Sequence, residues 1–163
     1  KKQEVKVMAK SENGIENVTN GYKLSGDSYL LFNRLGYHNK ITFTVTTSNN
    51  RDKFGISFVR GTDSEKYYSM IVNPENDQTR KVNFEEEGTA GHGFIAGIDG
   101  YNFARPSDNI YHVTIYTDNS IAVMYINNVC CYTNRIYGIQ KNCWSINNYG
   151  GNVTITDLTV SQY

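Results

Sequence analysis

The residue types in this 163-residue chain that could do chemistry are chiefly those that bind sugars. A sugar site pairs an aromatic ring, which covers an apolar sugar face, with charged or amide side chains that bond neighbouring hydroxyl groups. The chain has such residues near the long loop 88–109 and the predicted strands that follow it. They are Asp118, Arg105, Arg135, Tyr137, Trp144 and Asn127. We hypothesise that they converge on a glycan. The alternative is that Trp144 and Tyr137 belong to the core.

Catalysis by this chain has weaker support. Paired carboxylates could hydrolyse a glycosidic bond, and the candidates are Glu85, Glu86, Glu87, Asp99, Asp108 and Asp118. Asp99 and Asp118 lie in IDG and TDN, where aspartate is favoured for backbone reasons alone. No Gly-x-Ser-x-Gly motif and no phosphate-binding glycine loop is present. We therefore predict no catalytic residue in this chain.

Metal and cofactor motifs are also weak. The histidines are far apart in sequence, without the spacing of zinc ligands. Oxygen-bearing side chains suited to calcium cluster in one turn, without the spacing of an EF-hand loop. They are Asn73, Glu75, Asn76 and Asp77. We predict no metal and no cofactor, with a structural calcium ion as the alternative.

The three cysteines limit disulfide formation. Cys130 and Cys131 are adjacent, so on a strand they point to opposite faces and at most one can pair with Cys143. We favour buried free thiols over a Cys130–Cys143 or Cys131–Cys143 disulfide.

The overall charge excludes some partners. Lysine plus arginine equals aspartate plus glutamate, 16 of each. A nucleic-acid or membrane-surface protein would need a basic excess. No apolar run is long enough to span a membrane, and KKQEVKVMAK lacks the apolar core of a signal peptide. We expect neither nucleic acid nor membrane as a partner.

The elements that would position these residues are strands. Residues 110–117, 120–126 and 129–137 read as three antiparallel strands, joined by two-residue turns at Asp118-Asn119 and Asn127-Asn128. The middle strand is apolar on both faces, which predicts that it lies inside a sandwich. Further strands are predicted at 28–33, 40–48, 54–60, 67–73, 79–84, 142–147 and 153–161, the last two joined by a turn at Gly150-Gly151.

About eleven short strands without an amphipathic helix predict an all-β fold, a two-sheet jelly-roll (concanavalin-like) β-sandwich. Residues 14–163 would form a single sandwich domain, and residues 1–13 a linker or an edge strand. The long irregular loop 88–109 is where binding residues would be expected.

The segments VTIYTDNSIAVMYINNVCCYTNRIYG and NCWSINNYGGNVTITDLTV resemble the C-terminal β-sandwich of glycoside hydrolase family 32, the invertases, levanases and inulinases. That domain has an Asp-x-Ser-x-x-Glu-x-Phe segment, an Asn-x-Gly turn, a Thr-x-Arg-x-Tyr strand and a Gly-Gly hairpin. The matching positions are Asp118, Ser120, Asn127, Thr133, Arg135, Tyr137 and Gly150-Gly151. The glutamate of the family is Ala122 here. The likeness covers roughly residues 28–160 and is strongest over 110–160.

The resemblance implies a non-catalytic accessory module of a bacterial fructan or sucrose hydrolase, whose catalytic carboxylates lie in a five-bladed propeller domain. Its expected partners are that propeller domain and a glycan, for which fructan is the candidate. The protein would be secreted, periplasmic or on the cell surface. An autonomous module for fructan or another glycan, similar to carbohydrate-binding family 66, is the second hypothesis. Ala122 cannot accept a hydrogen bond where that module would use glutamate. A small independent glycosidase is the third hypothesis.

Overall fold

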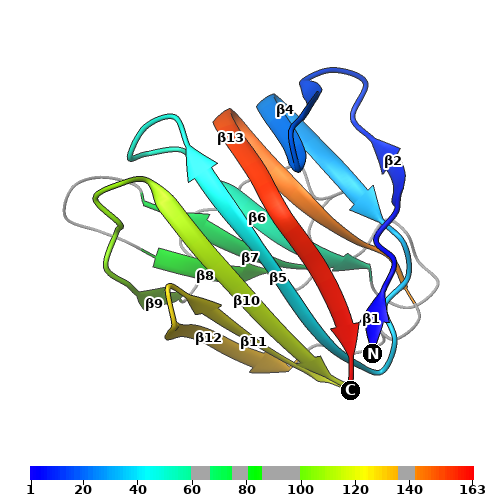
Figure 1. The fold of residues 1–163 in the computed structure, drawn as a ribbon. Helices are drawn as coiled ribbons and strands as arrows, with labels where there is room; N and C mark the ends of the chain where they lie inside the picture. Colours follow the sequence, from blue (N-terminus) through cyan, green and yellow to red (C-terminus); the bar gives the residue numbers. More distant parts are fainter. Residues whose placement is uncertain (60–66, 75–80, 86–99, 136–141) are drawn as a thin grey trace.

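The computed structural model describes residues 1–59, 67–74, 81–85, 100–135 and 142–163. These residues form strands and no helix (Figure 1), so none of them makes a helix that could cross a membrane. The strands are β1 (Lys2–Gln3), β2 (Val7–Lys10), β3 (Ile15–Val18), β4 (Gly21–Phe32), β5 (His38–Thr47), β6 (Phe54–Val59), β7 (Tyr67–Asn73), β8 (Lys81–Glu85), β9 (Gly100–Asn102), β10 (Ile110–Asp118), β11 (Ile121–Ile126), β12 (Val129–Arg135) and β13 (Trp144–Gln162).

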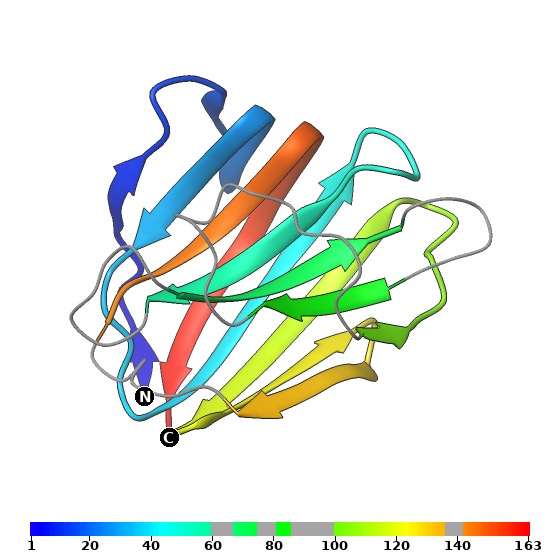
Figure 2. The same cartoon turned by 180° about the vertical axis from the view of Figure 1, so that it is seen from behind.

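Two antiparallel layers share their longest strands. The hydrogen-bonded order is β12-β11-β10-β5-β13-β6-β7-β8-β9, and β4 runs beside β13 along both of its halves. The C-terminal half of β13 pairs with β5, whereas its N-terminal half pairs with β6. Figures 1 and 2 show the two layers from opposite sides. The all-β sandwich prediction is therefore confirmed.

The corner between the layers lies at glycines. The register of β13 against β4 shifts between Tyr149 and Asn152, and Gly150 has φ +98°. Gly26, opposite this shift on β4, has φ +66°. An irregularity of this kind bends a strand and lets it pass from one sheet to the other. The predicted Gly150-Gly151 turn is wrong, because these residues bend one continuous strand instead of ending it.

The core fills the space between the layers by alternation along each strand. On β10, Tyr111, Val113 and Ile115 point inward and are buried, as the period-2 pattern predicts. On β11 only one face is buried, and Val123 and Tyr125 on the other face are half-exposed. The prediction that β11 is covered on both faces is therefore wrong, since β11 lies near the edge of its sheet with one face open.

The turns that join β10, β11 and β12 fix their register. Asn127 and Asn128 have φ +51° and +65°, which confirms the predicted two-residue turn. The first turn is Asn119-Ser120, one residue later than predicted, because Asp118 still pairs with Ile121. Strand β3 and the first half of β4 are strands that the sequence analysis did not predict.

Candidate glycan-binding surface

The residues proposed to converge on a glycan are divided by the fold. Asp118 ends β10, whereas Arg105 precedes that strand and Asn127 lies beside its start. Strand β10 has 9 residues, so its two ends are roughly 27 Å apart at about 3.4 Å per residue. The backbone of Arg135 pairs with Ile121 at the Asp118 end. Tyr137 lies outside the described residues.

Arg105 and Asn127 hold the backbone at their end of the sheet. Arg105 Nη1 donates to the carbonyl oxygen of Asn50 at 3.1 Å. Asn127 Oδ1 accepts from the backbone N–H of His112 at 2.8 Å, and its Nδ2 donates to the carbonyl oxygen of Ile110 at 3.5 Å. These bonds stabilise the loops at the start of β10. The glycan hypothesis therefore depends on the residues at the opposite end of this strand, where Asp118 lies.

Trp144 does not provide an exposed platform in this structure. Its side chain is 0% exposed, and its ring centroid lies 4.6 Å from that of Phe32, the residue opposite it on β4. A ring without accessible surface cannot cover a sugar face. Trp144 is therefore a core residue, the alternative considered from the sequence.

Asp118 has a partner that the sequence did not indicate. Its Oδ1 lies 2.7 Å from His38 Nδ1, and the two side chains are 60% and 41% exposed, respectively. The antiparallel register of β5 against β10 places His38 directly opposite Asp118. The sequence could have indicated this pair only if the start of β5 had been predicted to lie opposite the end of β10. The spacing of residues along the chain does not reveal that pairing.

Tyrosines extend this pair into a larger surface. The Tyr163 ring lies 5.9 Å from the His38 ring and 6.3 Å from the Tyr116 ring. Tyr116 also meets Tyr125 edge-on at 6.0 Å, at an angle of 87°. Lys40 Nζ lies 5.7 Å from the Tyr116 ring centroid, within cation–π range. We call these six residues, His38, Lys40, Tyr116, Asp118, Tyr125 and Tyr163, the tyrosine surface.

The tyrosine surface combines rings with hydrogen-bonding groups. Tyr116 points outward because it alternates with the buried residues of β10, and Tyr163 is 64% exposed. The pKa of Tyr163 is raised, chiefly by partial burial and secondarily by the nearby Asp118 and Tyr116. Its phenol is therefore neutral near pH 7. A carboxylate, an ammonium and an imidazole thus border exposed rings, the types required for a sugar-binding surface.

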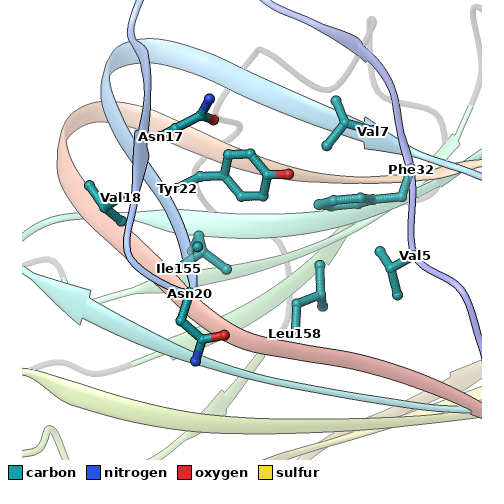
Figure 3. Close-up of a pocket in the computed structure, with 10 residues that line it drawn as sticks. Val5, Val7, Asn17, Val18, Asn20, Tyr22, Phe32, Ile155 and Leu158 are labelled. Carbon is teal, nitrogen blue, oxygen red and sulfur yellow. The ribbon is translucent and has the colours of Figure 1, made fainter.

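A separate pocket opens at the other edge of the sandwich, beside β2, β3 and β4 (Figure 3). Its volume is about 410 Å³. It is lined by Val5, Val7, Asn17, Val18, Asn20, Gly21, Tyr22, Phe32, Ile155 and Leu158. We call it the edge pocket.

Comparison with protein families identifies the domain type. Residues 1–160 match the model of the GH32, BT1760-like, C-terminal domain. The chain belongs to this family. Its membership implies a parent protein with a glycoside hydrolase catalytic domain, to which this accessory domain is C-terminal. No curated protein sequence matches the chain.

Solved structures with this fold include the carbohydrate-binding module CBM66 from Bacillus subtilis. It has 14% sequence identity and a TM-score of 0.71, over 97% of this chain and 95% of that one. The Caenorhabditis elegans galectin LEC-6 has 12% identity and a TM-score of 0.58, over 90% and 99% of the two chains. The carbohydrate recognition domain of Emp46p has 10% identity and a TM-score of 0.59, over 90% and 84%. At these identities the likeness establishes the fold alone.

In this GH32 C-terminal domain, the described residues contain no group of three or more histidines, cysteines or carboxylates able to hold a metal ion. Asn73 of the calcium hypothesis is buried on β7, and residues 75–77 lie outside the described part. Cys130, Cys131 and Cys143 are free thiols, exposed, buried and half-buried in that order.

Proposed function

We propose that this GH32 C-terminal domain binds a neutral glycan through its tyrosine surface, with fructan as the first polymer to test. The observation that carries the proposal is the cluster around Tyr116, where outward aromatic rings lie next to His38, Lys40 and Asp118. Family membership supports a carbohydrate as the ligand, because the parent enzyme acts on glycosidic bonds. A structural neighbour is itself named a carbohydrate-binding module.

The geometry supports an open surface in place of a deep site. The Tyr116 and Tyr125 rings meet at 87°, so they present differently oriented faces to one bound chain. The imidazole of His38 and the carboxylate of Asp118 are already paired at 2.7 Å. A carboxylate accepts at several lone pairs, so Asp118 can keep this partner and still accept from a sugar hydroxyl.

The test is titration calorimetry of the domain against levan, inulin, sucrose and fructose. We expect binding that weakens at least about tenfold in Tyr116→Ala and in Asp118→Asn, the loss typical of a central contact. The matched control is His112→Ala, also outward on β10 but four residues from Tyr116 and outside the tyrosine surface. Unchanged affinity in Tyr116→Ala, or silence with every glycan from a folded protein, would refute this function.

Stabilisation of the parent catalytic domain is the second candidate, and the observation that favours it is the match to a C-terminal domain over residues 1–160. We expect the parent enzyme to lose thermal stability when this domain is removed. Unchanged unfolding of the truncated enzyme would contradict this role. A glycan-binding enzyme of this family would act outside the cytoplasm, where polymeric substrates occur, and fractionation of the source cells would test that location.

A further inference from the structure

The edge pocket shares no lining residue with the tyrosine surface and has different chemistry. One wall comes from the N-terminal segment with Val5 and Val7, and another from β13 with Ile155 and Leu158. The floor includes Phe32 of β4. Val5, Val7, Tyr22 and Leu158 pack against the core yet stay only half-buried. They therefore present apolar surface that a ligand could cover.

The walls carry no formal charge. Among the described lining residues there is no carboxylate, ammonium or guanidinium group. Asp157, next to the lining residue Leu158, already accepts from Asn20 Nδ2. A charged ligand would therefore be desolvated here without a counter-charge, which is strongly unfavourable. The occupant must be neutral.

Two polar side chains at the edge pocket lack protein partners. In the described part of the chain, neither the Asn17 amide nor the Tyr22 hydroxyl makes a hydrogen bond to protein. Figure 3 shows the Tyr22 hydroxyl directed toward the side where Val7, Phe32 and Leu158 stand. The pocket thus exposes both apolar side chains and a few polar groups that could fix the orientation of a ligand, a mixture also found in small-molecule sites.

We propose that the edge pocket binds a small neutral ring compound with one or two hydroxyl groups, of the phenol or cyclic-alcohol class. The ring contacts the half-buried Val5, Val7 and Leu158, and a hydroxyl exchanges a hydrogen bond with Tyr22. Asn17, Asn20 and Tyr22 are the side chains of the pocket that can form hydrogen bonds. Asn20 already donates to Asp157, so Asn17 and Tyr22 are left to bond the one or two hydroxyls of this ligand class.

The volume agrees with a ligand of this size. A closed apolar cavity of about 150 Å³ binds benzene. The edge pocket, at about 410 Å³, has room for one or two rings with their substituents. It is also within the range of about 300–1,000 Å³ typical of small-molecule sites.

The test uses 4-methylphenol as the probe, titrated into the ¹⁵N-labelled domain and followed by two-dimensional NMR. We expect saturable shifts confined to the amides of residues 5–7, 17–22 and 155–158. The expected dissociation constant is on the order of 1 mM for a ligand this small. Tyr22→Phe, which keeps the ring, should weaken 4-methylphenol about fivefold, the factor for one neutral hydrogen bond. Binding of toluene, which has no hydroxyl, should not change in this variant.

Tyr116→Phe is the matched control, since it removes a tyrosine hydroxyl from the tyrosine surface and should leave the probe's affinity unchanged. Leu158→Glu places a charge in the half-buried wall and should weaken both probes more than tenfold. Fructose binding at the same amides as tightly as 4-methylphenol would overturn the ligand class. Absence of saturable shifts, or equal probe affinity in wild type and Tyr22→Phe, would overturn the site or its polar contact. None of these outcomes depends on glycan binding at the tyrosine surface.

Discussion

Replacing Trp144 with alanine should destabilise the domain strongly without touching a glycan site. The indole is 0% exposed and stacks 4.6 Å from Phe32 across the pairing of β13 with β4. Truncation of a buried aromatic residue to alanine costs about 3–5 kcal/mol. The buried indole Nε1 has no acceptor among the residues that the structure describes, and its removal returns part of that loss. We therefore expect about 3 kcal/mol.

Trp144→Phe separates packing from any contact with ligand. It keeps an aromatic ring against Phe32 and removes the unpaired N–H, so its cost should stay below about 1.5 kcal/mol. At about 2–4 °C per kcal/mol for a domain of this size, the alanine variant should melt roughly 6–12 °C lower. The phenylalanine variant should stay within about 6 °C of the wild type.

The assay is urea denaturation followed by far-UV circular dichroism, with glycan titrations on the folded variants. Because Trp144 is the only tryptophan, its fluorescence gives a second readout, and a buried ring should resist quenching by acrylamide with or without glycan. A stable Trp144→Phe protein that has lost glycan binding would refute the core assignment. A cost below about 1 kcal/mol for alanine would refute it as well.

Two further predictions test the backbone packing and the cysteines. Gly21→Ala should lower the free energy of unfolding in urea by about 1–3 kcal/mol. The Cβ of the new alanine would lie 1.8 Å from the carbonyl oxygen of Ile155 and would push β4 away from β13. An unchanged free energy of unfolding would contradict that close approach. Iodoacetamide at mildly alkaline pH should alkylate exposed Cys130 well before Cys131, since burial raises the pKa of the Cys131 thiol and the thiolate is the reactive form. Peptide mass spectrometry gives the order, and equal rates would show that Cys131 is accessible.

The tyrosine surface depends on strand pairings that local sequence patterns do not encode. Asp118 was singled out by residue type, whereas His38 joins it only through the register of β5 against β10. Trp144 was singled out for its ring, which suits a sugar face and a core equally well. Its burial follows from its place opposite Phe32 between two layers, a long-range arrangement.

Gly150-Gly151 shows the same limit in the backbone. Two glycines permit both a tight hairpin and a bend within a strand, because glycine adopts positive φ at little cost. Pairing with β4 favours the bend over the hairpin, since β4 continues along β13 on both sides of Gly150-Gly151. Apolar residues on both faces of β11 were likewise read as burial, whereas Tyr125 contributes to the tyrosine surface.

The sequence by itself determined the all-β class, the alternation of strands β10–β12 and the Asn127-Asn128 turn. Each of these is set by side-chain period or by φ preference within a few residues. Only the tertiary structure decided which strands pair across the corner, which rings are buried, and which polar groups meet at the tyrosine surface and the edge pocket. Those outcomes depend on contacts between residues far apart in the chain, which the spacing of residues along the sequence does not predict.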